Sequence, residues 1–357
     1  MKNSLTKKIS KTINRIPFYL RRRFTKKYIV FQSDDWGMEQ AKSIEGINFI
    51  KKKFGKENFT RWTTDSMETT DDLSLLFELL MRYKSSFKNP PNITANFITH
   101  NINYNSNTHL SFISLKDYLK KNKELADIYA VGMKNKILSA ELHGYCHNDI
   151  KKLDDYFHTK EGQLLFENGF FVGKGTLRGS LNKFRSEFVN SNKWIKSKFL
   201  QSKAEFQRFF NFLPISIIPA HFIFENNFVG LLYKNGIKAI QATNWLKNSR
   251  NKTFKNPYFR KFKNLIWLPR NARLDPHPDY NHNAYSCLKN IDIAFKNKSP
   301  AIIDFHRVNI AGRFNEKYRD RTLRELGIVF DNILKYWPEV EFVSTKDFIE
   351  LCLRKIK

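Results

Sequence analysis

Cysteine, glycine, proline and acidic residues are all scarce in this chain of 357 residues. The three cysteines, Cys146, Cys287 and Cys352, are far apart and odd in number, so they build no disulfide framework of the kind that small secreted domains use. With 14 glycines and 11 prolines, the chain is poor in the residues of flexible or collagen-like segments. No apolar run reaches the roughly 18 residues of a membrane-spanning helix. The hydrophobic fraction of 41% and the charged fraction of 27% are those of a globular protein.

The charge is strongly one-sided, with 62 Lys and Arg against 34 Asp and Glu, and a formal net charge of +28. Lysine outnumbers arginine by 43 to 19. Because bidentate contacts to bases and phosphates favour arginine, this composition argues against nucleic acid as the partner. Two readings stay open for the excess: a lysine-rich composition without a specific role, or attraction to an anionic membrane surface or acidic glycan.

Residues 1–27 form a separate basic leader, with ten Lys or Arg and no acidic residue. It is not a signal peptide, because its short apolar run contains Arg15 and Pro17 and ends in three arginines instead of a small-residue cleavage site. We expect either a disordered tail or an amphipathic segment on an anionic membrane surface. Without a signal or a disulfide framework, the expected location is the cytoplasm, with peripheral attachment to the membrane through this leader as the second possibility.

Apolar runs and helical patterns alternate along the rest of the chain. The pattern predicts strands at residues 28–31, 93–98, 137–142, 215–218, 237–242, 301–305 and 340–343. It predicts helices at residues 70–83, 115–125, 198–210, 228–235 and 319–336. Strands that alternate with helices are typical of an α/β protein with parallel strands, and about seven strands over this length favour a (β/α) barrel. In such barrels the functional residues follow the strands, where this chain has an Asp pair and several histidines.

Asp34 and Asp35 directly follow the first predicted strand. Two adjacent carboxylates point in different directions, so one of them can bind a cation while the other acts as a base. The alternative is that the pair only caps a helix.

His143 and His147 are four residues apart, which places both imidazoles on one face if the segment turns helically. Glu141 and Asp149 flank the pair, and we expect them to orient the rings. The segment is not the H-E-x-x-H motif, because Gly144 stands where that motif has its Glu. Two histidines on an exposed helix are the alternative.

Together with Asp35, His143 and His147 make a two-histidine, one-carboxylate set with an open position for water, which suits Zn²⁺ or a similar divalent ion in hydrolysis. His306 ends another apolar strand, two residues after Asp304 on the same face. It is either a general acid for the leaving group or a hydrogen-bonded core histidine.

The order of these motifs resembles the polysaccharide deacetylases of the NodB-homology type (carbohydrate esterase family four). The family's first motif, Asp-Asp-Gly, is similar to Asp34-Asp35-Trp36-Gly37, in which Trp36 is inserted. Its second, His-(Ser/Thr)-x-x-His, is similar to the segment from His143 to His147, with Gly144 in place of the hydroxyl residue. Its last, Leu-x-His, is similar to the strand end at His306. The resemblance extends from residue 28 to about residue 350.

The resemblance implies a distorted (β/α) barrel that removes N- or O-acetyl groups from a polysaccharide or glycan precursor. Removal of an N-acetyl group hydrolyses a carbon–nitrogen bond that is not a peptide bond. It implies Asp34 as the general base and His306 as the general acid. It also implies a divalent metal, in the first place Zn²⁺, on Asp35, His143 and His147.

The third motif departs from the family pattern. Its Arg, which orients the base, is absent from Ile218-Pro219-Ala220-His221, and His221, Arg270 or Arg273 is expected to replace it. The Trp of the fourth motif is similar to Trp245, but its Asp has no match at residues 241–244.

Residues 28–357 are expected to form one catalytic domain with inserts near 38–90 and 246–300. The second insert contains Asp275-Pro276-His277-Pro278-Asp279, for which a Pro-rich loop is the preferred reading and a lining of the substrate cleft is the alternative. The residues expected to contact the sugar are Trp36, Tyr145, His221 and Trp245, with the three aromatic rings as an apolar platform. Packing of these rings in the core is the alternative.

Two functions of other kinds compete with deacetylation. A degenerate, non-catalytic barrel would bind an anionic glycan or nucleic acid through lysines, with an affinity that depends on salt and not on metal. A phosphoesterase would use similar ligands, but two-metal sites usually need more clustered carboxylates than this sequence has.

Overall fold

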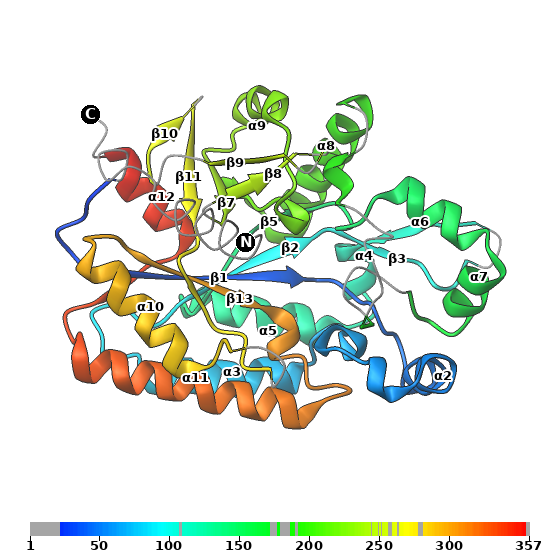
Figure 1. Ribbon diagram of the computed structural model, residues 1–357, viewed down its shortest axis with the longest axis horizontal. Coiled ribbons are helices and arrows are strands. Elements are labelled where there is room, and N and C mark those ends of the chain that lie inside the picture. Colours follow the sequence, from blue (N-terminus) through cyan, green and yellow to red (C-terminus); the bar gives the residue numbers. More distant parts are fainter. Residues whose placement is uncertain are drawn as a thin grey trace, which may run out of the picture.

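The structure is a computed structural model that describes residues 22–354 except 107–108, 172–176, 179–185, 190–191, 244, 249, 251, 256–258, 263 and 278–280. Its centre is a ten-stranded, mostly parallel sheet that curls between layers of helices (Figure 1). The strand order is β10-β11-β7-β6-β5-β2-β1-β13-β12, and β14 pairs with β1. Among the described residues the edge strands β10 and β12 do not pair with each other, so the sheet forms a partial barrel. The predicted α/β class and the distorted barrel are confirmed.

The sheet consists of strands from both halves of the chain. They are β1 (Tyr28–Trp36), β2 (Ile93–Ile98), β5 (Leu138–Gly144), β6 (Ser216–Ile217), β7 (Ala239–Ala242), β10 (Lys261–Phe262), β11 (Leu265–Pro269), β12 (Ala272–Arg273), β13 (Ala301–His306) and β14 (Glu341–Phe342). Two small antiparallel pairs lie outside it: β3 (His100–Ile102) with β4 (Phe112–Ser114), and β8 (Trp245–Lys247) with β9 (Thr253–Lys255). All seven predicted strands are present.

The helices cover both faces of the sheet and one of its ends. They are α2 (Ile44–Phe54), α3 (Thr70–Arg82), α4 (Leu115–Leu119), α5 (Lys123–Lys134), α6 (Ile150–Phe157), α7 (Lys160–Glu167), α8 (Asn192–Phe210), α9 (Val229–Lys234), α10 (Ala284–Lys296), α11 (Glu316–Tyr336) and α12 (Thr345–Arg354). In Figure 1, α3, α5, α10 and α11 lie along one face, while α2, α6 and α7 lie beyond the end to which β1 points. Every residue of β1 is buried, because both faces of this central strand are covered.

One helix prediction differs from the structure, whereas the helix predicted at residues 70–83 is present as α3. The predicted helix 115–125 is two helices, since Asn122 caps a new one by accepting a hydrogen bond from the Leu125 N–H. The helix predicted at residues 70–83 begins with a capping box in which Thr69 and Asp72 bind each other's backbone N–H groups.

The segment predicted as an insert at residues 246–300 is part of the barrel. Its strand β11 pairs with β7, and its strand β12 pairs with β13, both in parallel. The boundary prediction is therefore wrong here: β11 (LIWLP) was missed because it is short and ends in proline. This matters for the site, because Arg270 and Asp275 follow these strands directly.

Residues 1–21 of the predicted leader lie outside the described residues, so its character stays a prediction. Residues 22–27 pack onto the domain: Phe24 is 3% exposed and its ring lies 5.4 Å from that of Phe348. Arg22 donates to the Cys352 carbonyl. No helix in the described part of the chain is long and apolar enough to cross a membrane.

Candidate active site

The Asp pair lies at a bulge at the end of β1. The pairing of β1 with β2 shifts register between Ser33 and Trp36, and Asp35 has a φ of +67°. Neighbours on a regular strand would face opposite sides of the sheet, but the bulge turns both Asp34 and Asp35 into one pocket.

Trp36 stabilises this bulge from the core. Its indole N–H donates to the Ser33 hydroxyl at 2.7 Å, and its ring packs against Phe97 and Tyr129 with no exposed surface. The prediction that Trp36 contacts the sugar is therefore wrong.

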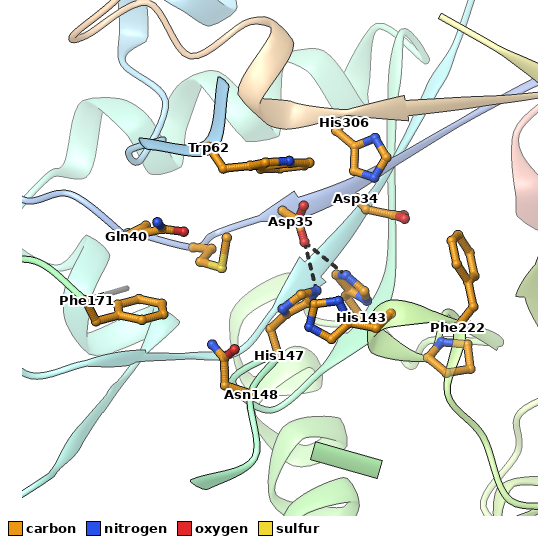
Figure 2. Close-up of a pocket in the computed structure, with 13 residues that line it drawn as sticks. Asp34, Asp35, Gln40, Trp62, His143, His147, Asn148, Phe171, Phe222 and His306 are labelled. Atoms are coloured by element: carbon orange, nitrogen blue, oxygen red, sulfur yellow. Dashed lines mark hydrogen bonds and ion pairs between the residues drawn. The ribbon is translucent and has the colours of Figure 1, made fainter. Parts of the chain in front are cut away.

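His143 and His147 converge on Asp35, although not through a helix. His143 is in β5, the chain turns at Gly144 with a φ of +123°, and His147 has a φ of +69°. The Nε2 atoms of His143 and His147 lie 3.1 and 3.4 Å from the same Asp35 oxygen (Figure 2). The predicted grouping of these residues holds, but the helical turn predicted to produce it is absent.

The protonation of Asp35 and His147 suits a divalent cation, whereas His143 must release a proton when a cation binds. Burial raises the pKa of Asp35, but His147 and His143 outweigh it and hold that pKa well below its usual range. Burial lowers the pKa of His147 to about 4, so its ring is neutral at pH 7. Burial also acts to lower the pKa of His143, but the bond to Asp35 prevails and raises it to about 8. Potential ligand atoms of all three lie within 4.8 Å of one another, and one carboxylate with two imidazoles is a set that binds Zn²⁺.

The ring of His143 is oriented by a backbone group. Its Nδ1 lies 3.0 Å from the Ile218 carbonyl, which can only accept, so Nδ1 keeps a proton and Nε2 is the atom that would give up its proton to a cation. Glu141 was predicted to orient the rings but instead accepts from the N–H groups of Ile215 and Ser216, at 3.0 and 2.7 Å. Asp149, the other predicted partner, caps α6. Both of these predictions are wrong.

Asp34 is held by Arg270, one of the three residues expected to replace the missing Arg. The guanidinium donates to both carboxylate oxygens, at 2.7 and 2.5 Å, and Asn96 donates to one of them at 2.9 Å. Arg270 also donates to Asp304 and, at 3.1 Å, to Gln32. Burial raises the pKa of Asp34, but Arg270 outweighs burial and keeps it below its usual value, so Asp34 is a carboxylate.

His306 has its own buried partner, Asp275. Its Nδ1 lies 3.3 Å from the Asp275 carboxylate, which also binds Arg61 at 3.0 Å and Arg273 at 2.5 Å. Burial acts to lower the pKa of His306, but Asp275 and Asp304 raise it overall, which favours a protonated ring. Asp275 lies in the loop after β12, as expected, but it is fully buried and pairs with His306.

These groups surround a pocket of about 240 Å³. Its walls are Asp34, Asp35, Met38, Gln40, Trp62, His143, His147, Asn148, Phe171, Pro219, His221, Phe222 and His306. Figure 2 shows Trp62 and His306 on one side of the carboxylates and His143 and His147 on the other. The ring of Trp62 meets that of His306 edge-on at 5.2 Å. Sequence reasoning missed Trp62, Phe171 and Phe222, since no motif marks them.

The remaining substrate predictions have mixed outcomes. His221 lines the pocket, with its ring 4.4 Å from that of His147. Tyr145 stacks on His100 at 3.9 Å instead of lining this pocket, so its prediction is wrong. The side chain of Trp245 lies outside the described residues.

Arg307 binds the backbone of Asp35, a contact that the sequence did not predict. Its Nε donates to the Asp35 carbonyl at 2.8 Å, and its guanidinium forms ion pairs with Asp65 at 2.8 Å and Glu68 at 3.4 Å. All of these side chains are buried. Arg307 thus ties the positive-φ residue Asp35 to the segment before α3.

No protein-family model matches the chain, and no curated protein matches it. Solved structures do match. A 4-alpha-glucanotransferase from Thermococcus litoralis aligns with 91% of this chain and 40% of its own, at a TM-score of 0.47 and 8% identity. A family 4 acetyl xylan esterase from Clostridium thermocellum, solved with a cobalt ion, aligns with 91% of each chain, at a TM-score of 0.42 and 11% identity.

A family 4 pseudoenzyme from Bacillus anthracis also matches, over 91% of this chain and 66% of its own, at a TM-score of 0.43 and 8% identity. Members of the family that the sequence resembles are thus among the solved structures found. Because all of these TM-scores are below 0.5, the matches carry no argument about this chain, and a case for activity depends on its own side chains.

Proposed function

We propose that this protein is a metal-dependent hydrolase that removes acetyl groups from a glycan. The observation that carries the proposal is the convergence of three potential metal ligands, one arginine-bound carboxylate and one histidine paired with a buried carboxylate on a single pocket. A purely structural role for these residues would not require five ionisable groups to face the same small space.

Asp35, His143 and His147 would hold the cation. When bound there, a divalent cation polarises the acetyl carbonyl and makes a water molecule more acidic. Side chains of the protein carry out the proton transfers.

Asp34 is held in one orientation by Arg270 and accepts the proton of the attacking water. His306, whose pKa is raised by Asp275 and Asp304, donates a proton to the departing amine or alkoxide. Asp275 fixes the ring so that Nε2 is the donating atom.

The pocket walls support a sugar as the substrate. Trp62, Phe171 and Phe222 give apolar surface for the face of a pyranose ring, while Gln40 and Asn148 offer hydrogen bonds to its hydroxyl groups. We infer an acetylated polysaccharide or glycan precursor, with either amide- or ester-linked acetyl groups.

The test is acetate release from N-acetylated chitooligosaccharides and acetylated xylan by the full chain reconstituted with Zn²⁺ or Co²⁺. Asp35→Ala and His143→Ala should abolish both metal binding and release. If the protein binds metal but releases no acetate from any acetylated sugar, deacetylation is refuted, and a salt-sensitive, metal-independent affinity for anionic glycans would then favour the non-catalytic alternative.

A further inference from the structure

The turn between the two histidines has no side chain at Gly144, and a buried carboxylate fills that space. A Cβ atom at Gly144 would lie against Glu187 Oε1, far inside van der Waals contact. The φ of +123° at Gly144 is also one that residues with a Cβ rarely adopt. The space beside Gly144 is therefore filled by a group from a distant part of the chain.

Glu187 binds the backbone of this turn. The Tyr145 N–H donates to both carboxylate oxygens, at 2.9 and 3.2 Å. The N–H groups of Cys146 and His147 also act on this carboxylate. Three successive N–H groups turned toward one carboxyl group form the concave arrangement known as a nest, and burial raises the pKa of this group to about 7.

Glu187 is itself held in place on both sides. Ser186 forms an isolated antiparallel bridge with Asn148, the residue that follows His147 and lines the pocket. Phe188 is buried in the main core, with its ring 6.4 Å from that of Phe224. The carboxylate of Glu187 is 4% exposed, so water does not compete strongly for the N–H groups.

We propose that Glu187 is a positioning residue for the metal site, which fixes the Gly144–His147 turn so that His147 faces Asp35. The inference rests on the proposed function, because it assigns a role at the proposed metal site. His147 has a positive φ, a conformation that non-glycine residues adopt only when their surroundings enforce it. The carboxyl oxygens of Glu187 supply that constraint by accepting from the backbone N–H groups of the turn.

Glu141 provides a matched control. It is a buried carboxylate that accepts from two backbone N–H groups, those of Ile215 and Ser216, but it binds the start of β6 and not the turn. Removing either carboxylate leaves buried N–H groups unpaired and should lower the midpoint of thermal unfolding. Only the loss of Glu187 should affect the metal site.

The experiment measures the dissociation constant for Zn²⁺ by chelator competition in the full chain, for the wild type, Glu187→Ala, Glu187→Gln and Glu141→Ala. Outer partners of metal ligands typically contribute a factor of about 10–100 in affinity, and we expect a weakening of that size in Glu187→Ala. Glu187→Gln keeps the shape and one accepting oxygen, so it should recover most of the affinity. Glu141→Ala should bind Zn²⁺ like the wild type.

A second readout needs no metal. In the metal-free protein, the amide hydrogens of residues 145–147 should exchange faster in Glu187→Ala than in the wild type or Glu141→Ala. If the wild type binds Zn²⁺ and Glu187→Ala binds it equally tightly, this inference is wrong and the proposed function stands. An equal loss of affinity in Glu141→Ala would also overturn it, as a general effect of destabilisation. If the wild type itself binds no Zn²⁺, the proposed function fails together with the inference.

Discussion

Replacing Arg270 by methionine removes the cation that binds Asp34, the proposed base. The guanidinium is 5% exposed and makes two hydrogen bonds to Asp34, one to Asp304 and one to Gln32. Methionine keeps much of the volume but removes the charge, so two buried carboxylates lose their common cation. Removing one partner from a buried ion pair costs about 3–5 kcal/mol, and we expect Arg270→Met to lose that much unfolding free energy at pH 7.

The pH dependence of this loss follows from the direction of the pKa shift. In the wild type the pKa of Asp34 is lowered by Arg270, so its contribution to stability is present above the unfolded value of 3.8 and is lost as the pH falls through the lower folded value. Without Arg270, burial dominates and raises the pKa of Asp34. The variant should then lose stability as the pH rises through that raised value, so its deficit is largest at neutral pH and shrinks on acidification.

Two assays check this prediction. Urea unfolding from pH 4 to 8 gives the free energies, with Arg82→Met as the control, because the Arg82–Glu78 pair is 64% exposed on both sides and contributes only about 0.3–0.5 kcal/mol. The acid limb of kcat/KM should also move to higher pH in Arg270→Met, since a protonated Asp34 is no base. The reasoning is refuted if Arg270→Met matches the control in stability at every pH and keeps the acid limb of the wild type.

Three further substitutions separate the roles at the site. Asp34→Asn should bind Zn²⁺ like the wild type but lose about 10²–10⁴-fold in kcat, and turnover close to that of the wild type would remove Asp34 as the base. His306→Gln should lose activity on N-acetyl sugars but keep most of it on aryl acetates, whose phenolate leaves without a proton; equal losses on both substrates would contradict its role as the acid. Trp62→Ala should raise KM for sugars with little loss of stability. Trp36→Ala empties a core position and should lower the free energy of unfolding, measured by heat or urea, by about 3–5 kcal/mol. The reverse pattern would contradict the placement of these two residues.

The ends of the parallel strands were predictable because the strands are buried apolar runs that stop at polar residues. The strand predicted at residues 93–98 has the same bounds as β2. The same pattern marked Asp34, Asp35, His143 and His306 as residues at strand ends, and all four line the pocket. Parallel strands bring their carboxyl ends to one edge, so short local patterns were enough to group these side chains.

The partners of these residues were not predictable in the same way. Arg270 and Asp275 follow short strands inside a segment that looked like an insert, and Glu187 precedes no recognisable element. Their roles arise from contacts between residues far apart in the chain, which no local periodicity encodes. The expected helical turn at residues 143–147 failed for a related reason: spacing alone cannot distinguish a helix from a turn at a positive-φ glycine.

The central claim is that Asp35, His143 and His147 hold a catalytic divalent cation. The most direct measurement is acetate release from an N-acetylated chitooligosaccharide as Zn²⁺ is titrated into the metal-free full chain. Activity should rise from zero and level off at one equivalent of metal per chain, and Asp35→Ala should stay inactive throughout. Full activity of the metal-free protein, or activity in Asp35→Ala equal to that of the wild type, would contradict the account.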